Sequence, residues 1–299
     1  MGLQFLSYSQ IDKAKWDACI DAAGNGLVYA YSFYLDNMAK HWDALILNDY
    51  EAVMPLTWNK KFDIAYLHTP PFIQQLGIFS KTVLPEDLIR SFVAAVQQRF
   101  RFAELFVNFN NGTGQPNYVL SLHQSYDLIR QRYKPTLLKS LKHAARFSFN
   151  YLEEENISEA VNMSKNQYGG RLPHIKEQDY RNFEKLCKVA KNKGGLAIRK
   201  VIDENNATLA IVLLLKDKRR LYNIISAVTQ KGRQCEANYY LYDKLIMEFA
   251  GQQMVLDFEG SSIEGIASFY QKFGTHIEPY FLLGYNNLPW PIKYLKKRY

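Results

Sequence analysis

Two carboxylates stand at the end of an apolar segment near the C-terminus, in the order Met-Val-Leu-Asp-Phe-Glu-Gly from Met254 to Gly260. Side chains alternate along a strand, so Val255, Asp257 and Glu259 would share one face of it. Burying a charge is costly unless the charge is paired or used. A carboxylate at a strand end can accept the proton of an attacking amine, directly or through water. The segment therefore predicts a chemical site built on Asp257 and Glu259.

The segments before this strand predict the helices and strands that must position it. Helices are expected at about 158–167 and 176–191, and strands at 196–203, 207–216 and 220–229. A helix at about 235–250 carries an apolar residue at every fourth position, which is typical of a core-facing stripe. That stripe consists of Ala237, Leu241, Leu245 and Phe249. A strand at 254–258 follows, then a turn, a further helix and a last strand.

The first half of the chain shows the same order of elements. Helices are expected at about 9–23 and 31–40, then strands at 44–47, 51–59 and 62–68, a helix at 86–100 and a strand at 104–109. Two strand-like segments follow near 118–122 and 126–130. The order α-α-β-β-β-α-β thus recurs at an offset of roughly 150 residues, which is an ordinary domain size. The strand end that matches the acidic one, Phe106 to Asn110, is uncharged.

Three features together resemble the Fem-type (FemAB-like) branch of the GNAT-like acyl-CoA N-acyltransferase superfamily. They are the acidic strand end Asp-Phe-Glu-Gly-Ser from Asp257, the helix Gly-Ile-Ala-Ser-Phe-Tyr-Gln-Lys-Phe-Gly from Gly265, and the repeated element order. The segment from Leu137 to Phe147 is similar to the basic helix that Fem-type proteins place between their halves, although the second of the usual paired arginines is missing.

The resemblance implies an α/β (α+β) fold of two tandem GNAT-like domains, each a mixed twisted sheet flanked by helices. We expect an N-terminal domain at 1–133, a basic linker helix at 134–150, and a C-terminal domain at 151–299 that carries the active cleft. The implied chemistry is transfer of an acyl or aminoacyl group from a carrier, acyl-CoA or aminoacyl-tRNA, to an amine. A protein that kept the fold and lost the site, as a scaffold or binding module, is the alternative.

Catalytic roles can be distributed over the residues near the acids. Asp257 or Glu259 would accept the amine proton, Tyr270 or Tyr240 would protonate the leaving oxygen or sulfur, and Lys272 would stabilise negative charge. The opposing interpretation is structural, with Glu259 as a turn residue.

The turn after the strand at 220–229 is the predicted cofactor site, where acyl-CoA would bind as co-substrate. In acyl-CoA transferases backbone amides at this turn hold the pyrophosphate, because a helix N-terminus attracts anions. The residues concerned are Lys231, Gly232, Arg233, Gln234 and Cys235. The family pattern has several spaced glycines, whereas only Gly232 is present here, so an ordinary loop-to-helix turn is the alternative.

The connection between the two helices of the second half lines the acceptor pocket in the GNAT fold. Here it contains two adjacent glycines and three polar side chains, Tyr168, Arg171 and His174. The glycines give backbone freedom and the polar groups give reach. A plain helix–helix turn explains the same residues.

The net charge of +8 is concentrated in two segments. In the first, Lys139, Lys142 and Arg146 fall on one helix face, with Leu137, Leu141 and Ala144 on another. This stripe would suit a polyanion such as the tRNA backbone, with marked salt dependence. The second segment is the C-terminal tail, which would suit peripheral contact with a membrane surface. It contains Lys293, Lys296, Lys297 and Arg298. Solvated surface charge is the alternative for both.

The composition limits the classes of protein to which the chain could belong. A chain of 299 residues with 47% hydrophobic content can bury a sizeable core, and no apolar run is long enough to span a membrane. The three scattered cysteines and the absence of a secretory signal favour the cytoplasm. The six histidines lack metal-ligand spacing, so no metal is expected.

Overall fold

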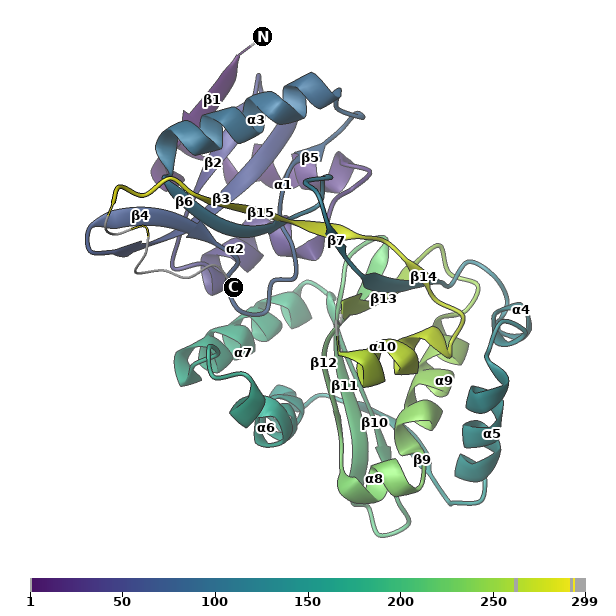
Figure 1. The fold of residues 1–299 in the computed structure, drawn as a ribbon. Coiled ribbons are helices and arrows are strands. Elements are labelled where there is room, and N and C mark those ends of the chain that lie inside the picture. Colours follow the sequence, from purple (N-terminus) through teal and green to yellow (C-terminus); the bar gives the residue numbers. More distant parts are fainter. Residues whose placement is uncertain (1, 261–262, 291–292, 294–299) are drawn as a thin grey trace. The chain divides into compact units, whose positions relative to one another are not determined.

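A computed structural model describes residues 2–260, 263–290 and 293, which form two compact units (Figure 1). Unit 1 comprises residues 1–114 and 279–299, and unit 2 comprises residues 115–278. Each unit has one mixed β-sheet with helices on both faces. The predicted tandem α/β architecture is therefore confirmed.

The elements of unit 1 follow the predicted order closely. Its strands are β1 (Leu3–Leu6), β2 (His41–Leu47), β3 (Ala52–Lys61), β4 (Ile64–His68), β5 (Phe79–Ser80), β6 (Phe102–Val107) and β15 (Tyr280–Asn286), with β7 (Gly114–Gln115) at the unit boundary. Its main helices are α1 (Lys13–Ala22), α2 (Ser32–Met38) and α3 (Glu86–Arg99). The strand order is β1-β2-β3-β4-β6-β15-β7, and β5 pairs with β3. The pairing of β4 with β6 is parallel, whereas β1–β2, β2–β3, β3–β4 and β6–β15 pair antiparallel.

Unit 2 repeats this arrangement. Its strands are β8 (Asn117–Ser121), β9 (Asn150–Glu154), β10 (Leu196–Ile202), β11 (Thr208–Lys216), β12 (Arg220–Val228), β13 (Val255–Gly260) and β14 (His276–Ile277). Its helices are α4 (Tyr126–Arg130), α5 (Pro135–Ala144), α6 (Ile157–Tyr168), α7 (Glu177–Asn192), α8 (Gln230–Gln234), α9 (Ala237–Phe249) and α10 (Glu264–Gln271). The strand order is β14-β8-β13-β12-β11-β10-β9, with β12 and β13 parallel.

The two sheets are completed by an exchange of strands along the chain. β8 follows the first set of elements but pairs antiparallel with β13 of unit 2. β15 follows the second set but pairs antiparallel with β6 of unit 1. The compact units consequently divide the chain at residues 114 and 278, instead of the predicted divisions near residues 133 and 150. The predicted boundary assigned each repeat to one domain. It could not account for β8 and β15, which follow one repeat in the sequence but pair in the sheet of the other unit.

Two local predictions need correction. Residues 126–130, predicted as a strand, form helix α4, which starts after Ser125 with Asp127 in its first turn and Arg130 in its last. Such a short apolar run does not distinguish a strand from a helix by periodicity. The basic helix α5, predicted as a linker between the domains, belongs to unit 2 and packs against α9.

The core of unit 2 lies between the sheet and the helices α5, α9 and α10. Leu137, Leu141 and Ala144 of α5 are buried, as the helix pattern predicts. On α9 the stripe Ala237, Leu241, Leu245 and Phe249 is buried as well. Helices α6 and α7 cover the opposite face of the same sheet (Figure 1). This packing holds β12 and β13 side by side, and the candidate site lies where they end.

Candidate active site at the end of β13

The parallel strands β12 and β13 pair over a short distance and then separate. Their register runs from Arg220 opposite Val255 to Tyr222 opposite Asp257. Beyond that point the Asn223 side chain donates a long hydrogen bond of 3.5 Å to the Phe258 carbonyl oxygen. A side chain thus bridges the two strands where main-chain pairing has ended.

The end of β13 is also irregular on its other side. The register with β8 shifts between Asp257 and Gly260, and Glu259 has a left-handed backbone with φ of 65°. Left-handed φ is uncommon for residues other than glycine, and such bulges often re-aim side chains near functional sites. The irregularity places Asp257 and Glu259 in different environments, although simple alternation predicts a shared face.

Asp257 is buried in a network of charged and polar groups. Its Oδ2 accepts hydrogen bonds from Arg220 at 2.9 Å and from Asn117 at 3.1 Å, and its Oδ1 accepts from the Glu259 amide at 2.9 Å. Arg220 also pairs with Glu278 at 2.6 Å. Burial by itself would lower the pKa of Arg220. The two carboxylates have the larger combined effect and raise this pKa above its usual value, so the guanidinium stays charged. Both Asp257 oxygens are therefore engaged in holding three segments together, which favours a structural role over that of a base.

Glu259 has the properties that a proton acceptor needs. Its side chain is largely enclosed but keeps part of its surface exposed. Burial disfavours the charged form and raises the pKa of the Glu259 carboxyl to about 8. A catalytic base is most effective when its pKa lies near the working pH. Burial raises the pKa of Asp257 as well, although Arg220 opposes the shift, so it is the set of hydrogen bonds on both Asp257 oxygens that favours Glu259 as the proton acceptor.

Glu259 and Tyr168 both lie near Tyr270. Burial raises the pKa of Tyr270 well above its usual value, and Tyr242, Glu259 and Tyr168 raise it further, which places each of these three groups within electrostatic range of Tyr270. Tyr168, at the end of α6, accepts a hydrogen bond of 2.8 Å from Gln167. Gln167 in turn accepts one of 2.9 Å from the Val228 amide at the end of β12. The α6 terminus is thus fixed to the strand end, and Tyr168 belongs to the candidate site.

The other predicted site residues near this strand end have separate surroundings. Lys272 donates a hydrogen bond of 2.5 Å to the Tyr239 hydroxyl and lies over its ring. Arg171 ends a short 3-10 turn (Gly169–Arg171), and His174 is exposed in the loop that follows. The structure brings Tyr168, Glu259 and Tyr270 together and leaves the acceptor roles of Arg171 and His174 as predictions.

The predicted cofactor turn forms the short helix α8. The Thr229 side chain caps it by accepting a hydrogen bond of 2.9 Å from the Gly232 amide, and Lys231 pairs with Asp203 at 2.6 Å. A Cβ atom at Gly232 would lie 2.3 Å from the Leu209 carbonyl oxygen, so this glycine is required for packing against β11. The Cys235 thiol is buried, and burial raises its pKa. Arg233 and Gln234 are exposed. These contacts are those of a structural turn, and cofactor binding here stays a prediction.

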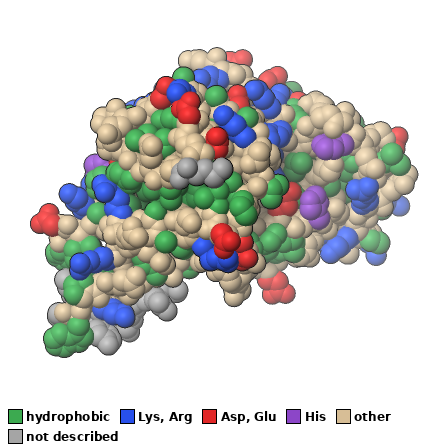
Figure 2. Space-filling view, turned by 90° about the horizontal axis from the view of Figure 1, so that it is seen from above, with side chains coloured by type: hydrophobic (Ala, Val, Ile, Leu, Met, Phe, Trp, Pro, Cys, Tyr) green, Lys and Arg blue, Asp and Glu red, His purple; other side chains and the backbone are tan. Residues whose placement is uncertain are grey.

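The basic face of α5 lies on the surface. Lys139 and Lys142 are exposed on the helix, whereas Arg146, predicted on the same helix face, is exposed in the turn after Ala144. Nearby Phe147 is 44% exposed and stacks on Phe149. On the face shown in Figure 2, by contrast, basic and acidic side chains are interspersed with apolar surface. Of the basic tail, Lys296, Lys297 and Arg298 lie outside the described residues.

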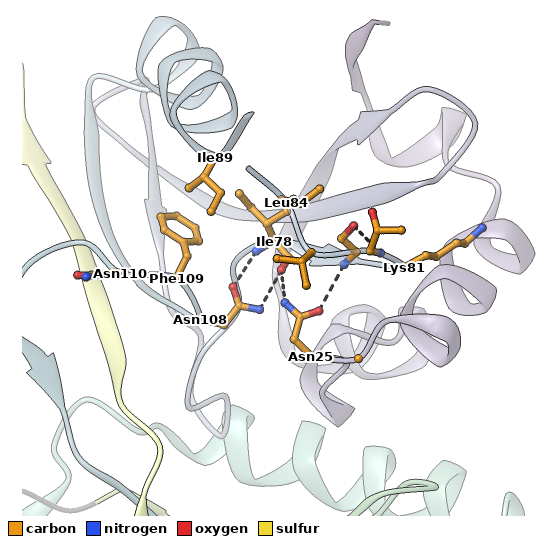
Figure 3. Close-up of a pocket in the computed structure, with 12 residues that line it drawn as sticks. Asn25, Ile78, Lys81, Leu84, Ile89, Asn108, Phe109 and Asn110 are labelled. Carbon is orange, nitrogen blue, oxygen red and sulfur yellow. Dashed lines mark hydrogen bonds between the residues drawn. The ribbon is translucent and has the colours of Figure 1, made fainter. Parts of the chain in front are cut away.

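Unit 1 has a cavity at the strand end that matches the acidic one. It measures about 520 Å³ and is lined in part by Ile78, Leu84, Ile89 and Phe109 (Figure 3). Asn108, directly after β6, accepts a hydrogen bond from the Ile78 amide and donates one to the Ile78 carbonyl oxygen, each of 3.0 Å. Gly77, with φ of 113°, leaves room for this contact, since a Cβ there would lie 2.2 Å from Asn108 Oδ1.

Among the described residues, no group of three or more histidine, cysteine or acidic side chains could hold a metal ion. In the same part of the chain, no helix is long and apolar enough to cross a membrane. Sequence reasoning missed Asn223 and Tyr242 at the strand divergence. The available signal was an asparagine within the apolar strand Leu-Tyr-Asn-Ile-Ile from Leu221.

Comparisons with known proteins give a clear result for the fold. No protein-family model matches the sequence, and no curated protein sequence matches it. Among solved structures, FemX is 11% identical, with 99% of both chains covered and a TM-score of 0.67. A conserved protein of unknown function from Bacteroides thetaiotaomicron is 11% identical, with 93% of this chain and 98% of that chain covered and a TM-score of 0.57.

A third structure is described as the C-terminal domain of a lysylphosphatidylglycerol synthetase from Agrobacterium fabrum. It is 12% identical, with 89% of this chain and 91% of that chain covered and a TM-score of 0.51. At these identities the similarity concerns the fold. The chain therefore shares the tandem fold of FemX, as its sequence predicts.

Proposed function

We propose that this protein is an N-acyltransferase that moves an acyl or aminoacyl group from a carrier to an amine, with Glu259 as the proton acceptor. The observation that carries the proposal is the largely enclosed Glu259 carboxyl, with its pKa of about 8, near Tyr270 at a strand divergence. The FemX-like fold and the lysylphosphatidylglycerol synthetase domain support group transfer of this kind. Perturbed pKa values in such a place are typical of functional sites.

The reaction follows from these groups. The amine nitrogen attacks the acyl carbon, the new C–N bond forms, and Glu259 takes the nitrogen's proton. The bond between the acyl carbon and the carrier oxygen or sulfur then breaks, and the proton passes from Glu259 to that leaving atom. Because its pKa is raised, Tyr270 stays protonated and can donate a hydrogen bond to the leaving atom.

We propose a polyanionic carrier, of the aminoacyl-tRNA type, bound over α5. Two observations support it over acyl-CoA at α8. Lys139 and Lys142 are exposed on α5, and Arg146 is exposed in the turn just after it. At α8 the capping amide and Lys231 are already bonded within the protein. Each phosphate contact should add to the salt dependence of binding.

Transfer assays with aminoacyl-tRNA and with acyl-CoA, each with a set of small amines, test the function. Product formed by the unaltered protein and lost in Glu259→Gln, which stays folded, is the expected result. Equal turnover by Glu259→Gln would reject Glu259 as the base. No product from either donor would favour the non-catalytic binding protein.

The carrier is tested by reversing the two charges on α5 and the one just after it, as Lys139→Glu, Lys142→Glu and Arg146→Glu. We expect weaker tRNA binding and a smaller salt slope, by about one unit per lost phosphate contact. A matched control reverses three cations on α7 with similar spacing: Arg181, Lys185 and Lys188. Unchanged tRNA binding in the α5 variant, or equal weakening in both, would reject the α5 site.

A further inference from the structure

An exposed aromatic side chain lies at the apex of the β3–β4 hairpin in unit 1. Phe62 and Asp63 form its two-residue turn, and Lys61 pairs with Ile64 across it. Both turn residues have a left-handed backbone, with φ of 50° and 57°. Such turns favour asparagine and glycine, because a bulky residue with positive φ is strained. The Phe62 side chain is 78% exposed, so packing in the core does not explain its presence here.

A second exposed aromatic side chain lies at the same end of this sheet. Strands β4 and β6 are parallel, so both begin at the end where the turn lies. β15 runs antiparallel to β6 and ends there, with Asn286 opposite Phe102. Trp290 follows in the next segment and is 79% exposed. Of the Phe, Tyr and Trp side chains that the structure describes, Phe62 and Trp290 are the most exposed, and their segments lie on the same side of unit 1 (Figure 1).

Two lysines lie beside the apex of the hairpin. Lys60 and Lys61 are both exposed, and as neighbours on a strand they face opposite sides of the sheet. The Lys60 ammonium lies over the Trp58 ring at 5.9 Å, and the Lys61 ammonium lies over the Phe62 ring at 5.7 Å. Neither forms an ion pair with a carboxylate among the described residues. Asp63 is the one acid in the turn, so the hairpin end has a net positive charge.

These features together suit the surface of an anionic membrane. Aromatic side chains favour the boundary between headgroups and acyl chains, and lysines favour anionic headgroups. A lysine stem can lie beside an inserted ring while its charge stays in water. A side chain at the apex of a tight turn also reaches a flat surface before the rest of the sheet does. The basic C-terminal tail starts at this end as well, since the Asn286 side chain donates a hydrogen bond of 3.3 Å to the Lys293 carbonyl oxygen.

We propose that this end of unit 1 binds anionic lipid surfaces, with Phe62 and Trp290 inserted among the headgroups and Lys60 and Lys61 beside the lipid phosphates. The binding is peripheral and reversible, because only a few side chains insert. The strained turn is then explained, since it holds the Phe62 ring out of the protein. The inference is independent of the proposed acyl transfer, whose residues all lie in unit 2.

Vesicle flotation of the whole chain tests the proposal, with pure phosphatidylcholine and with an equal mixture of phosphatidylcholine and phosphatidylserine. The protein should float with the mixture alone, and less of it should float as salt is raised. Phe62→Ser should weaken this binding by about ten-fold to 100-fold, because it removes an inserted apolar ring. Lys60→Gln and Lys61→Gln should each weaken it by about five-fold.

Two further variants separate insertion from general effects of surface and folding. Val83→Ser is the matched control, because Val83 is 98% exposed but follows β5, which pairs with the opposite end of β3. It should leave vesicle binding unchanged. The double change Phe62→Asn and Asp63→Gly relieves the strained turn, so it should leave Tm unchanged or raise it. It should still weaken vesicle binding, although it removes the one acid of the turn.

Several outcomes would overturn the inference. One is the absence of binding to the mixed vesicles, and another is equal binding by Phe62→Ser and the unaltered protein. Equal loss in Val83→Ser would also overturn it, because any exposed apolar side chain would then suffice. If Phe62→Ser weakened tRNA binding and kept vesicle binding, this end of the sheet would contact RNA instead of lipid. Acyl transfer between soluble substrates should be equal in Phe62→Ser and the unaltered protein, because the two surfaces act separately.

Discussion

The same strand end occurs twice in this protein, as Asn108-Phe109-Asn110 after β6 and as Asp257-Phe258-Glu259 in β13. The first polar residue is used for structure in both copies. Asn108 holds the Ile78 backbone, and Asp257 holds Arg220. The third residue differs. Asn110 is exposed and accepts a hydrogen bond from the Gly112 amide, whereas Glu259 is half-enclosed with a raised pKa.

The central phenylalanine shows the same contrast in packing. Phe109 lines a cavity of about 520 Å³ in unit 1. Phe258 is fully buried in unit 2 and packs against Tyr242, Tyr270 and Phe273. One strand end therefore borders a cavity and carries no charge of its own, and the other is packed with aromatic rings and carries two acids. The fold tolerates both because the strand pairing, which both copies share, does not depend on these side chains.

The largest effect should come from removing the acid that distinguishes the copies. Glu259→Gln is expected to lower kcat by about 100-fold to 10,000-fold, because it removes the proton acceptor and keeps the shape. Steady-state kinetics with the active donor measure the loss. Asn110→Ala, at the corresponding position of unit 1, should leave kcat within two-fold by the usual behaviour of exposed positions. Equal losses in both variants would contradict the contrast.

The second-largest effect concerns Asp257, whose position has a structural role at both strand ends. Asp257→Asn should destabilise the protein by about 3 kcal/mol, because it removes one partner of a buried ion pair. The loss of stability should lie at the low end of the usual range, because Arg220 keeps its ion pair with Glu278. Urea denaturation measures it. A variant as stable as the unaltered protein but without activity would restore Asp257 as a catalytic candidate.

The corresponding change in unit 1 should be smaller. Asn108→Ala loses two hydrogen bonds to Ile78 and leaves buried backbone groups unsatisfied, at a cost of about 1–3 kcal/mol. Asn110→Ala again serves as the control in the same denaturation experiment and should change stability by less than about 0.5 kcal/mol. If Asn108→Ala were neutral, the side chain would not hold this segment.

The smallest effect is a pH dependence of stability that only the acidic copy should show. The pKa of Glu259 rises from 4.5 to about 8 on folding, so the folded state binds the proton more tightly. Its contribution to stability is present below pH 4.5 and is lost as pH rises through about 8. The Tm difference between Glu259→Gln and the unaltered protein should therefore grow between pH 5 and pH 8. A constant difference would show that the pKa is not raised.

Much of the fold was predictable because its signals are local. The stripe on α9, the alternating or apolar strands, and the repeated order all reflect which side chains must leave water. Short edge strands gave weaker signals. β1 has four residues and β9 carries Glu153 and Glu154, so neither was predicted. The strand exchange of β8 and β15 was not predictable, because pairing between distant segments leaves no mark in local periodicity.

Some features of the candidate site were likewise predictable from the sequence, and others depended on the tertiary structure. The sequence by itself determined that two carboxylates end a core strand, because residue type and periodicity suffice for that. The resemblance to Fem-type and GNAT-like proteins suggested Tyr168 and Tyr270 as further site residues. Only the tertiary structure decided that Asp257 is held by hydrogen bonds, since Arg220 and Asn117 reach it from other strands. It also decided where Asn223 and Tyr242 meet. Burial and charge pairing are properties of neighbours in space, and these set the pKa of each acid.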